Sequence, residues 1–172
     1  MKDKRKRIAL FGGSFDPPHA AHIDIIFKLA DKFDKVIVLP AHISPFKPKA
    51  KTAKADDRVA MLESVGFPEN VKISHFELKQ EGVSYTYLTA AHYAQKFPDA
   101  KLYFVIGSDG LAGLEDWKNA DVLAATVRFY VIGREGFAVD DARVAELEAK
   151  GFRIKVSKLT CADVSSSAVK VA

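Results

Sequence analysis

Residues 11–22 read Phe11-Gly12-Gly13-Ser14-Phe15-Asp16-Pro17-Pro18-His19-Ala20-Ala21-His22. They follow the apolar run Ile8-Ala9-Leu10, which is typical of a buried strand. The adjacent glycines predict a sharp turn that brings the backbone close to a ligand. Asp16 and Pro17 are typical of a helix start, because aspartate can cap a helix and proline fits its first turn. The stretch therefore predicts a strand, a glycine turn and a helix.

The helix expected from His19 onwards places two histidines beside a ligand site. Its apolar positions recur three and four residues apart and are Ile23, Ile26, Phe27 and Ala30. A helix N-terminus offers N–H groups and the positive end of the helix dipole, which together bind phosphate. His19 and His22 are three residues apart and share a face of the first turn. Either histidine alone is better explained as a surface residue, so the argument depends on the whole stretch.

The remaining chain of 172 residues alternates between two patterns. Apolar runs typical of strands cover residues 35–40, 71–76, 101–107, 127–132 and 152–156. Helical patterns cover residues 56–65, 84–97 (with Ser84 as a cap) and 140–150. This alternation predicts an α/β fold: a Rossmann-like, doubly wound, mainly parallel sheet with helices on both faces. Without a repeat or an internal linker, residues 1–172 are expected to form a single domain.

Charge and composition exclude several classes of protein. The net charge is +4, and residues 2–7, with five basic residues and one acidic residue, account for all of it. Residues 1–6 are therefore a basic flank on a balanced body, and no nucleic-acid partner is expected. Cys161 is the single cysteine, which fits a reducing compartment. With no apolar run of roughly 18–20 residues and no signal peptide, we expect no membrane partner and a cytoplasmic protein.

Three further places are candidates for ligand contacts. Loops at the carboxyl ends of parallel strands carry ligands in α/β folds, and the loop of residues 41–55, which contains Lys47, has this position. Asp109 follows a central strand, where it could bond a ribose hydroxyl or cap a helix. Trp117, the single tryptophan, could fill the core or stack on a base.

The C-terminal segment, residues 164–172, is a second candidate phosphate site. It contains Val164-Ser165-Ser166-Ser167-Ala168-Val169-Lys170. Serine caps that open a short helix, followed by a cation, could cradle phosphate. Serine-rich tails are common, so this segment gains weight only together with residues 11–22.

Both stretches resemble signatures of the nucleotidyltransferase superfamily. The first is similar to G-[ST]-F-D-P-x-H-x-G-H, with Ala21 in place of the second glycine. The second is similar to I-S-S-T-x-[IV]-R, with Ser167 and Lys170 in place of threonine and arginine. From about residue 7 to 170 the chain resembles the bacterial nicotinate mononucleotide adenylyltransferases. The matching stretches are residues 12–22, 40–47, 84–86 and 104–109, with Trp117 and Arg134.

This resemblance implies an enzyme that joins ATP and nicotinate mononucleotide to give deamido-NAD and pyrophosphate. It implies Mg²⁺ held mainly by nucleotide phosphates, with no protein ligand to the metal. His19 and His22 would be catalytic. The implied ATP-binding residues are Gly12, Gly13, Ser14, Phe15, Gly107, Asp109, Ser165, Ser166 and Lys170. The implied mononucleotide-binding residues are Lys47, Thr86, Trp117 and Arg134, although Phe46 replaces the histidine usual beside Lys47.

Two alternatives stay open from the sequence. One is another adenylyltransferase of the superfamily, such as the one that acts on phosphopantetheine, because the ending Ser-Ser-Ser-Ala-Val-Lys resembles it too. The other is a nucleotide-binding module with weakened catalysis, which Ala21, Lys170 and the end of the chain at Ala172 motivate. The oligomeric state and the acceptance of nicotinamide mononucleotide also stay open.

Overall fold

The structure, a computed structural model, describes residues 5–13, 15, 20–41, 55–79, 85–134 and 138–161. For residues 55, 134 and 159–161 it describes the backbone alone. Ser14, His19, Lys47, Ser165, Ser166 and Lys170 lie outside the described residues. None of the helices in the described ranges is long and apolar enough to cross a membrane.

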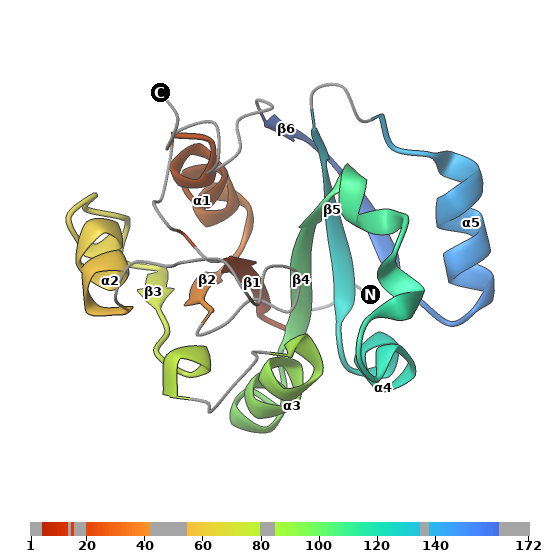
Figure 1. Ribbon diagram of the computed structural model, residues 1–172, viewed down its shortest axis with the longest axis horizontal. Coiled ribbons are helices and arrows are strands. Elements are labelled where there is room, and N and C mark those ends of the chain that lie inside the picture. Colours follow the sequence, from red (N-terminus) through yellow and green to blue (C-terminus); the bar gives the residue numbers. More distant parts are fainter. Residues whose placement is uncertain are drawn as a thin grey trace.

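A six-stranded parallel sheet forms the centre of the described chain (Figure 1). Its order is β3-β2-β1-β4-β5-β6, and every neighbouring pair is parallel. The strands are β1 (Arg7–Gly13), β2 (Lys35–Pro40), β3 (Val71–Ile73), β4 (Lys101–Gly107), β5 (Arg128–Arg134) and β6 (Ile154–Cys161). This is the strand order of the doubly wound Rossmann fold, so the predicted fold class is confirmed.

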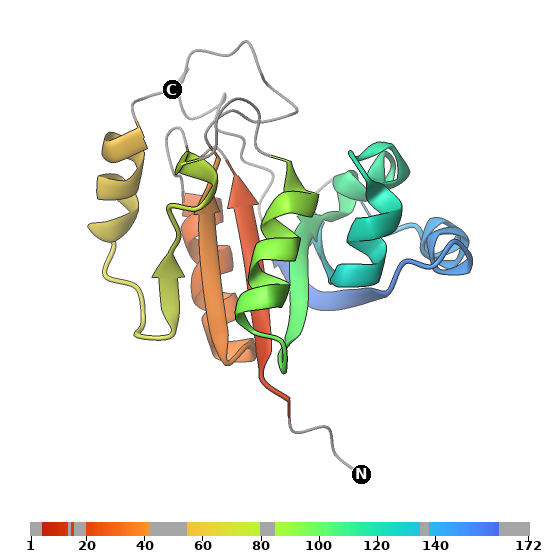
Figure 2. The ribbon, with the colours of Figure 1, turned by 90° about the horizontal axis from the view of Figure 1, so that it is seen from below.

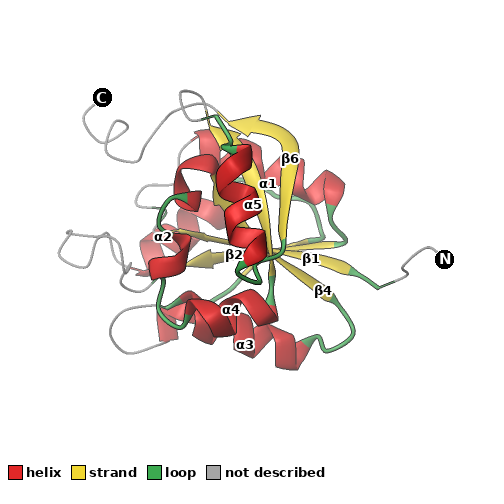
Figure 3. Cartoon of the chain, turned by 90° about the vertical axis from the view of Figure 1, so that its right-hand side faces the viewer, coloured by secondary structure: helices red, strands yellow, loops and turns green. Residues whose placement is uncertain are grey.

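Helices cover both faces of the sheet (Figures 1 and 3). They are α1 (Ala20–Lys32), α2 (Ala55–Glu63), α3 (Thr86–Lys96), α4 (Ala120–Thr126) and α5 (Asp141–Ala149). Three short 3₁₀ turns lie between strands and helices: η1 (Glu77–Lys79) precedes α3, and η2 (Ser108–Leu111) and η3 (Leu114–Asp116) lie between β4 and α4. One core packs residues of α3, α4 and α5 on the sheet, and the other packs residues of α1 and α2 on the opposite face.

Strand β1 contributes to both cores because alternate side chains of a strand point to opposite faces. Ile8 and Leu10 belong to the core under α3, α4 and α5. Ala9 and Phe11 belong to the core under α1 and α2. The strand is thus buried on both faces and paired on both edges, with β2 and β4.

The prediction of a glycine turn after this strand was wrong. Gly12 and Gly13 continue β1 and pair with Leu39 and Pro40. The left-handed backbone conformation falls instead on Phe15, whose φ is 49° and whose side chain is fully buried. A Cβ atom at Gly13 would lie 3.3 Å from the ring of Phe15. The glycine therefore makes room for this ring rather than for a turn.

The predicted apolar face of α1 also needed correction. The buried residues are Ala21, Ile25, Ile26 and Leu29. Of the predicted positions, Ile26 is buried, Ile23 and Ala30 are half-buried, and Phe27 is 38% exposed, with its ring against Phe67. The segment is apolar on two overlapping faces, so periodicity alone could not select the one that meets the sheet.

Other element boundaries differ from the sequence predictions for local reasons. The pattern over residues 71–76 gives only a three-residue strand, because Ser74 turns the chain and accepts a hydrogen bond from the Phe76 N–H (3.1 Å). The last strand starts at Ile154 and extends to Cys161. Helix α4 was not predicted: its seven residues are too few for a clear period, and it follows Asn119 with φ 51°.

Candidate functional site

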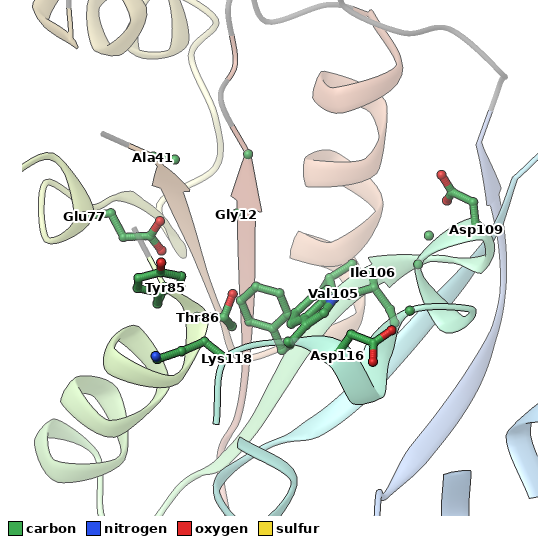
Figure 4. Close-up of a pocket in the computed structure, with 16 residues that line it drawn as sticks. Gly12, Ala41, Glu77, Tyr85, Thr86, Val105, Ile106, Asp109, Asp116 and Lys118 are labelled. Carbon is green, nitrogen blue, oxygen red and sulfur yellow. The ribbon is translucent and has the colours of Figure 1, made fainter. Parts of the chain in front are cut away.

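A cavity of about 870 Å³ opens at the carboxyl ends of the central strands (Figure 4). The chain leaves β1 for β2 and β3 and then returns to β4 on the other side of β1, as Figure 2 lets the reader follow. This switch in strand order separates the loops after β1 and β4, and in such folds the resulting crevice is where ligands bind. Its lining residues are Gly12, Gly13, Ala41, Glu77, Tyr85, Thr86, Phe104, Val105, Ile106, Gly107, Asp109, Gly110, Gly113, Asp116, Trp117 and Lys118.

The end of β4 places a carboxylate at the mouth of the cavity. A Cβ atom at Gly107 would lie 2.6 Å from Oδ1 of Asp109, so glycine leaves the space that this carboxylate occupies. Gly107 takes the N-cap position of η2, and Asp109 lies within that turn and is exposed. The cap interpretation of Asp109 is therefore wrong, and its exposed carboxylate is part of the cavity lining.

Trp117 both packs on the core and lines the cavity. Its half-buried ring meets Phe104 (6.0 Å between centroids, 89° between planes) and Phe129 (6.2 Å, 80°) edge to face. These contacts fix the ring orientation, because edge-to-face packing on two buried rings restricts its rotation. The two interpretations left open by the sequence are thus compatible in one side chain.

Helix α5 holds the segment that carries Trp117. The Arg143 side chain donates hydrogen bonds to the carbonyl oxygens of Leu111 (3.2 Å) and Ala112 (3.1 Å) and pairs with Glu115 (2.5 Å). Lys150 pairs with the same carboxylate. Hydrogen bonds from Lys150 and Arg143 hold the pKa of Glu115 below its usual value. One arginine thus ties residues 111–115 to the body of the fold.

The N-terminus of α3 forms another wall. Tyr85 occupies the N-cap position, and its side chain makes no capping hydrogen bond. Ser84, the predicted cap, lies outside the described residues. Tyr85 and Thr86 line the cavity, so the positive end of this helix is presented to a ligand.

Glu77 lines the same wall and was not recognised from the sequence. Its side chain is 7% exposed, and Thr89 Oγ1 donates a hydrogen bond to its Oε2 (2.9 Å). Burial raises the pKa of Glu77 from 4.5 to about 7, and the hydrogen bond from Thr89 offsets part of that effect. An isolated acidic residue between a strand and a helix carries no pattern that distinguishes it from a surface residue.

Six of the sequence-predicted site residues come together around the cavity: Gly12, Gly13, Thr86, Gly107, Asp109 and Trp117. His22 lies in the first turn of α1, and its ring meets Phe15 (5.1 Å, 79°) and Phe11 (6.3 Å, 66°) edge to face. Neither His22 nor Phe15 lines the cavity. Arg134 is the last residue of β5, of which the backbone alone is described.

Sequence and structure comparisons show which known proteins this chain resembles. A family model described as cytidylyltransferase-like matches residues 10–172. A protein of Clostridium novyi (strain NT) named "Probable nicotinate-nucleotide adenylyltransferase" is 33% identical over 171 residues, which cover 96% of this chain and 86% of that protein. A Clostridium botulinum (strain Hall) protein of the same name is 39% identical over 132 residues. That match covers 75% of this chain and 66%, just under two thirds, of the relative.

Solved structures share the fold at lower identity. Plasmodium falciparum nicotinic acid mononucleotide adenylyltransferase complexed with NaAD superposes with a TM-score of 0.75 at 20% identity, over 89% of this chain and 75% of the other. The same enzyme complexed with APC gives a TM-score of 0.71 at 21% identity, over 89% and 74%. At this identity the similarity establishes the fold.

We predict that Arg143→Met loosens the segment before Trp117. The variant loses both hydrogen bonds to carbonyl oxygens and the pair with Glu115, while the aliphatic stem is retained. Quenching of Trp117 fluorescence by acrylamide should therefore increase, and the single tryptophan makes the signal unambiguous. Glu146→Gln is the matched control, because it removes an Arg143 partner (2.9 Å) that does not touch the segment. Equal quenching in Arg143→Met and wild type would contradict the role of Arg143.

We also predict that the charge of Glu77 makes folding stability pH-dependent. Between pH 4.5 and 7 the folded protein keeps a proton on Glu77 that the unfolded chain releases, so the free energy of unfolding falls as the pH rises. The loss is roughly 3 kcal/mol and is complete above pH 7. Urea unfolding of wild type and Glu77→Gln at pH 5 and pH 8 measures it.

The difference between wild type and Glu77→Gln should change by roughly 2.5 kcal/mol between the two pH values, because part of the loss occurs below pH 5. Glu63→Gln, on the exposed side of α2, should show no such change. A constant difference between wild type and Glu77→Gln would mean that Glu77 ionises normally in the folded protein.

Proposed function

Because the chain belongs to the cytidylyltransferase-like family, among the nicotinate-nucleotide adenylyltransferases, we propose that it transfers the adenylyl group of ATP to nicotinate mononucleotide. The products are deamido-NAD and pyrophosphate, and the reaction is a step in NAD biosynthesis. We place this reaction in the cytoplasm and assign it to residues 1–172 as one nucleotidyltransferase domain, with no membrane or nucleic-acid partner.

The observation that carries the proposal is the pairing of Trp117 with the N-terminus of α3 around one cavity. Nicotinate is a flat, electron-poor ring that carries one carboxylate. An indole can stack on such a ring, and the positive end of a helix attracts a carboxylate. A site with both features fits the acid form of the ring better than the amide form, which has no charge to place there.

The remaining residues divide between the two substrates. Gly12, Gly13 and Gly107 let a nucleotide approach the strand ends closely, and Asp109 is placed to bond the ribose of ATP. We assign Ser14, Phe15, Ser165, Ser166 and Lys170 to ATP and Lys47, Thr86 and Arg134 to the mononucleotide, as the resemblance implies. His19 and His22 act on the transferred phosphate.

The chemistry needs little more than positioning and charge neutralisation. The attacking group is a phosphate oxygen, and a phosphate monoester is largely ionised near neutrality because its second pKa is about 6. No side-chain nucleophile is required, so the protein holds two polyanions in line and stabilises charge on the transferred group and on pyrophosphate. Among the described residues no three His, Cys, Asp or Glu side chains gather to hold a metal ion. As the resemblance implies, we assign Mg²⁺ to the nucleotide phosphates and water, where it would neutralise phosphate charge.

Pyrophosphate release from ATP tests the proposal. The reaction is run with nicotinate mononucleotide, with nicotinamide mononucleotide and with phosphopantetheine in parallel. Turnover with nicotinate mononucleotide, and much less with the other two, supports the proposal. Turnover with phosphopantetheine alone would replace it, and no turnover with any of them would leave a nucleotide-binding module.

We predict that His22→Ala lowers kcat/KM by roughly 10²–10³, the usual effect of removing one preorganised donor from a transition state. His22 lies in the first turn of α1, where the helix end and the imidazole can act on the same phosphate. His75→Ala, an exposed position after β3, is the control and should be fully active. A His22→Ala enzyme as active as this control would remove His22 from the mechanism.

We predict that Trp117→Ala raises the KM for nicotinate mononucleotide roughly tenfold or more and leaves the KM for ATP nearly unchanged. Ring stacking on an aromatic side chain is worth about 1–3 kcal/mol by alanine substitution. Trp117→Phe keeps a flat ring against Phe104 and Phe129 and should restore most of the affinity. Equal increases in both KM values for Trp117→Ala would indicate a general loss of structure instead of a lost ring contact.

A further inference from the structure

Glu77 is a buried carboxyl group that the proposed mechanism does not use. It is 7% exposed, yet it is part of the cavity lining. Figure 4 shows its carboxyl directed into the cavity, in the same region as Tyr85 and Thr86. Thr89 donates its hydrogen bond to Oε2, and Oε1 accepts none from the side chains and backbone that the structure describes.

The surroundings of Glu77 favour its neutral form. Two residues of α3 lie near Glu77. Thr89 donates the hydrogen bond to its carboxyl, and Tyr93 lies close enough for the charge of Glu77 to raise the pKa of the Tyr93 hydroxyl. That hydroxyl is hydrogen-bonded to Ser74 (2.5 Å). The charged residue that shares the η1 turn with Glu77 is Lys79, and its side chain is exposed to solvent. Around the described part of the cavity the other charged residues are Asp109, Asp116 and Lys118. Of these, Lys118 alone is a cation, and it is exposed.

A second carboxylate entering this wall would meet like charge. Two carboxylates that share a site cannot both ionise without cost, and the usual outcome is one proton held between them. The carboxylate of a nicotinate ring, drawn to the N-terminus of α3, would be that second group. The structure thus has a buried carboxyl group on the wall to which the proposed function assigns the ring carboxylate.

We propose that Glu77 recognises the acid form of the pyridine ring. Its protonated carboxyl donates a hydrogen bond to the ring carboxylate, so that the protein takes up a proton when nicotinate mononucleotide binds. This inference rests on the proposed function and adds the residue that distinguishes acid from amide. The ionised carboxylate of Glu77 instead accepts a hydrogen bond from the NH₂ of a nicotinamide ring. The preference for acid over amide therefore falls as the pH rises.

The pH range follows from the burial of Glu77. Its pKa of about 7 in the empty cavity means that the proton is present below pH 7 and is lost above it. Above pH 7 the affinity for the acid ring should fall by up to roughly tenfold for each pH unit, while that for the amide ring does not fall. The phosphate of both mononucleotides ionises in the same way, so the ratio of their dissociation constants cancels that contribution.

The test measures Kd for nicotinate and nicotinamide mononucleotide by Trp117 fluorescence from pH 6 to pH 9. In wild type the acid-to-amide preference should fall at least tenfold over this range. In Glu77→Gln the preference should be independent of pH, because glutamine keeps the acceptor for Thr89 and an NH₂ donor at every pH. Calorimetry in two buffers of different ionisation enthalpy should show proton uptake on binding the acid at pH 8 in wild type and none in Glu77→Gln.

Two further variants make the result specific. Thr89→Val removes the hydrogen bond that lowers the pKa of Glu77, so the midpoint of the pH dependence should move upward. Asp116→Asn neutralises another carboxyl of the cavity lining and should leave the pH dependence in place.

A wild-type preference that does not vary with pH, or the same variation in Glu77→Gln, would overturn the assignment of Glu77 while leaving the proposed function intact. Failure of wild type to bind either mononucleotide at any pH would overturn the proposed function and this inference with it.

Discussion

The parallel pairing of β1 with both β2 and β4 determines where this protein can bind a ligand. Strand β1 is hydrogen-bonded on both edges and buried on both faces. The chain that follows β1 therefore has to leave the sheet at the carboxyl end of this strand. Strands β2 and β3 lie on one side of β1, and β4 lies on the other side. This arrangement opens a crevice at the carboxyl end of β1. Gly12 and Gly13 extend the strand up to that opening, so bare backbone forms part of the cavity surface.

The strands and most helices could be predicted because a two-sided core requires long apolar runs, and such runs are visible in sequence. The resemblance to the adenylyltransferases led us to expect Gly107, Asp109 and Trp117 at the site, and all three line the cavity. The residues alone left two interpretations open for Asp109 and for Trp117. The role of Gly13 was not predicted. It depends on the ring of Phe15, which lies against Gly13, and on the left-handed backbone conformation of Phe15. Glu77 was missed for a related reason: its burial is produced by α3 packing over η1, which no local pattern records.

The described cavity wall is better suited to rings and hydroxyls than to phosphates. It carries three carboxyl groups and one ammonium group, whereas the proposed substrates are anions. Cations for the phosphates are expected at His19, Lys47 and Lys170, all outside the described residues. The proposed function therefore divides recognition in space: it assigns the ring and the ribose to the strand ends and α3, and the phosphates to the basic residues.

A buried glutamate in the cavity wall lowers the stability of the folded protein, and this loss suggests a role in ligand recognition. Ionised Glu77 destabilises the fold near neutral pH, and an apolar residue of similar size would avoid that loss. Among the described residues, the hydrogen bond from Thr89 reaches one of its two oxygens. Departures from good packing concentrate where a site must act on a ligand. A carboxyl poised between its two charge states, beside the positive end of α3, has the chemistry needed to distinguish a carboxylate from an amide.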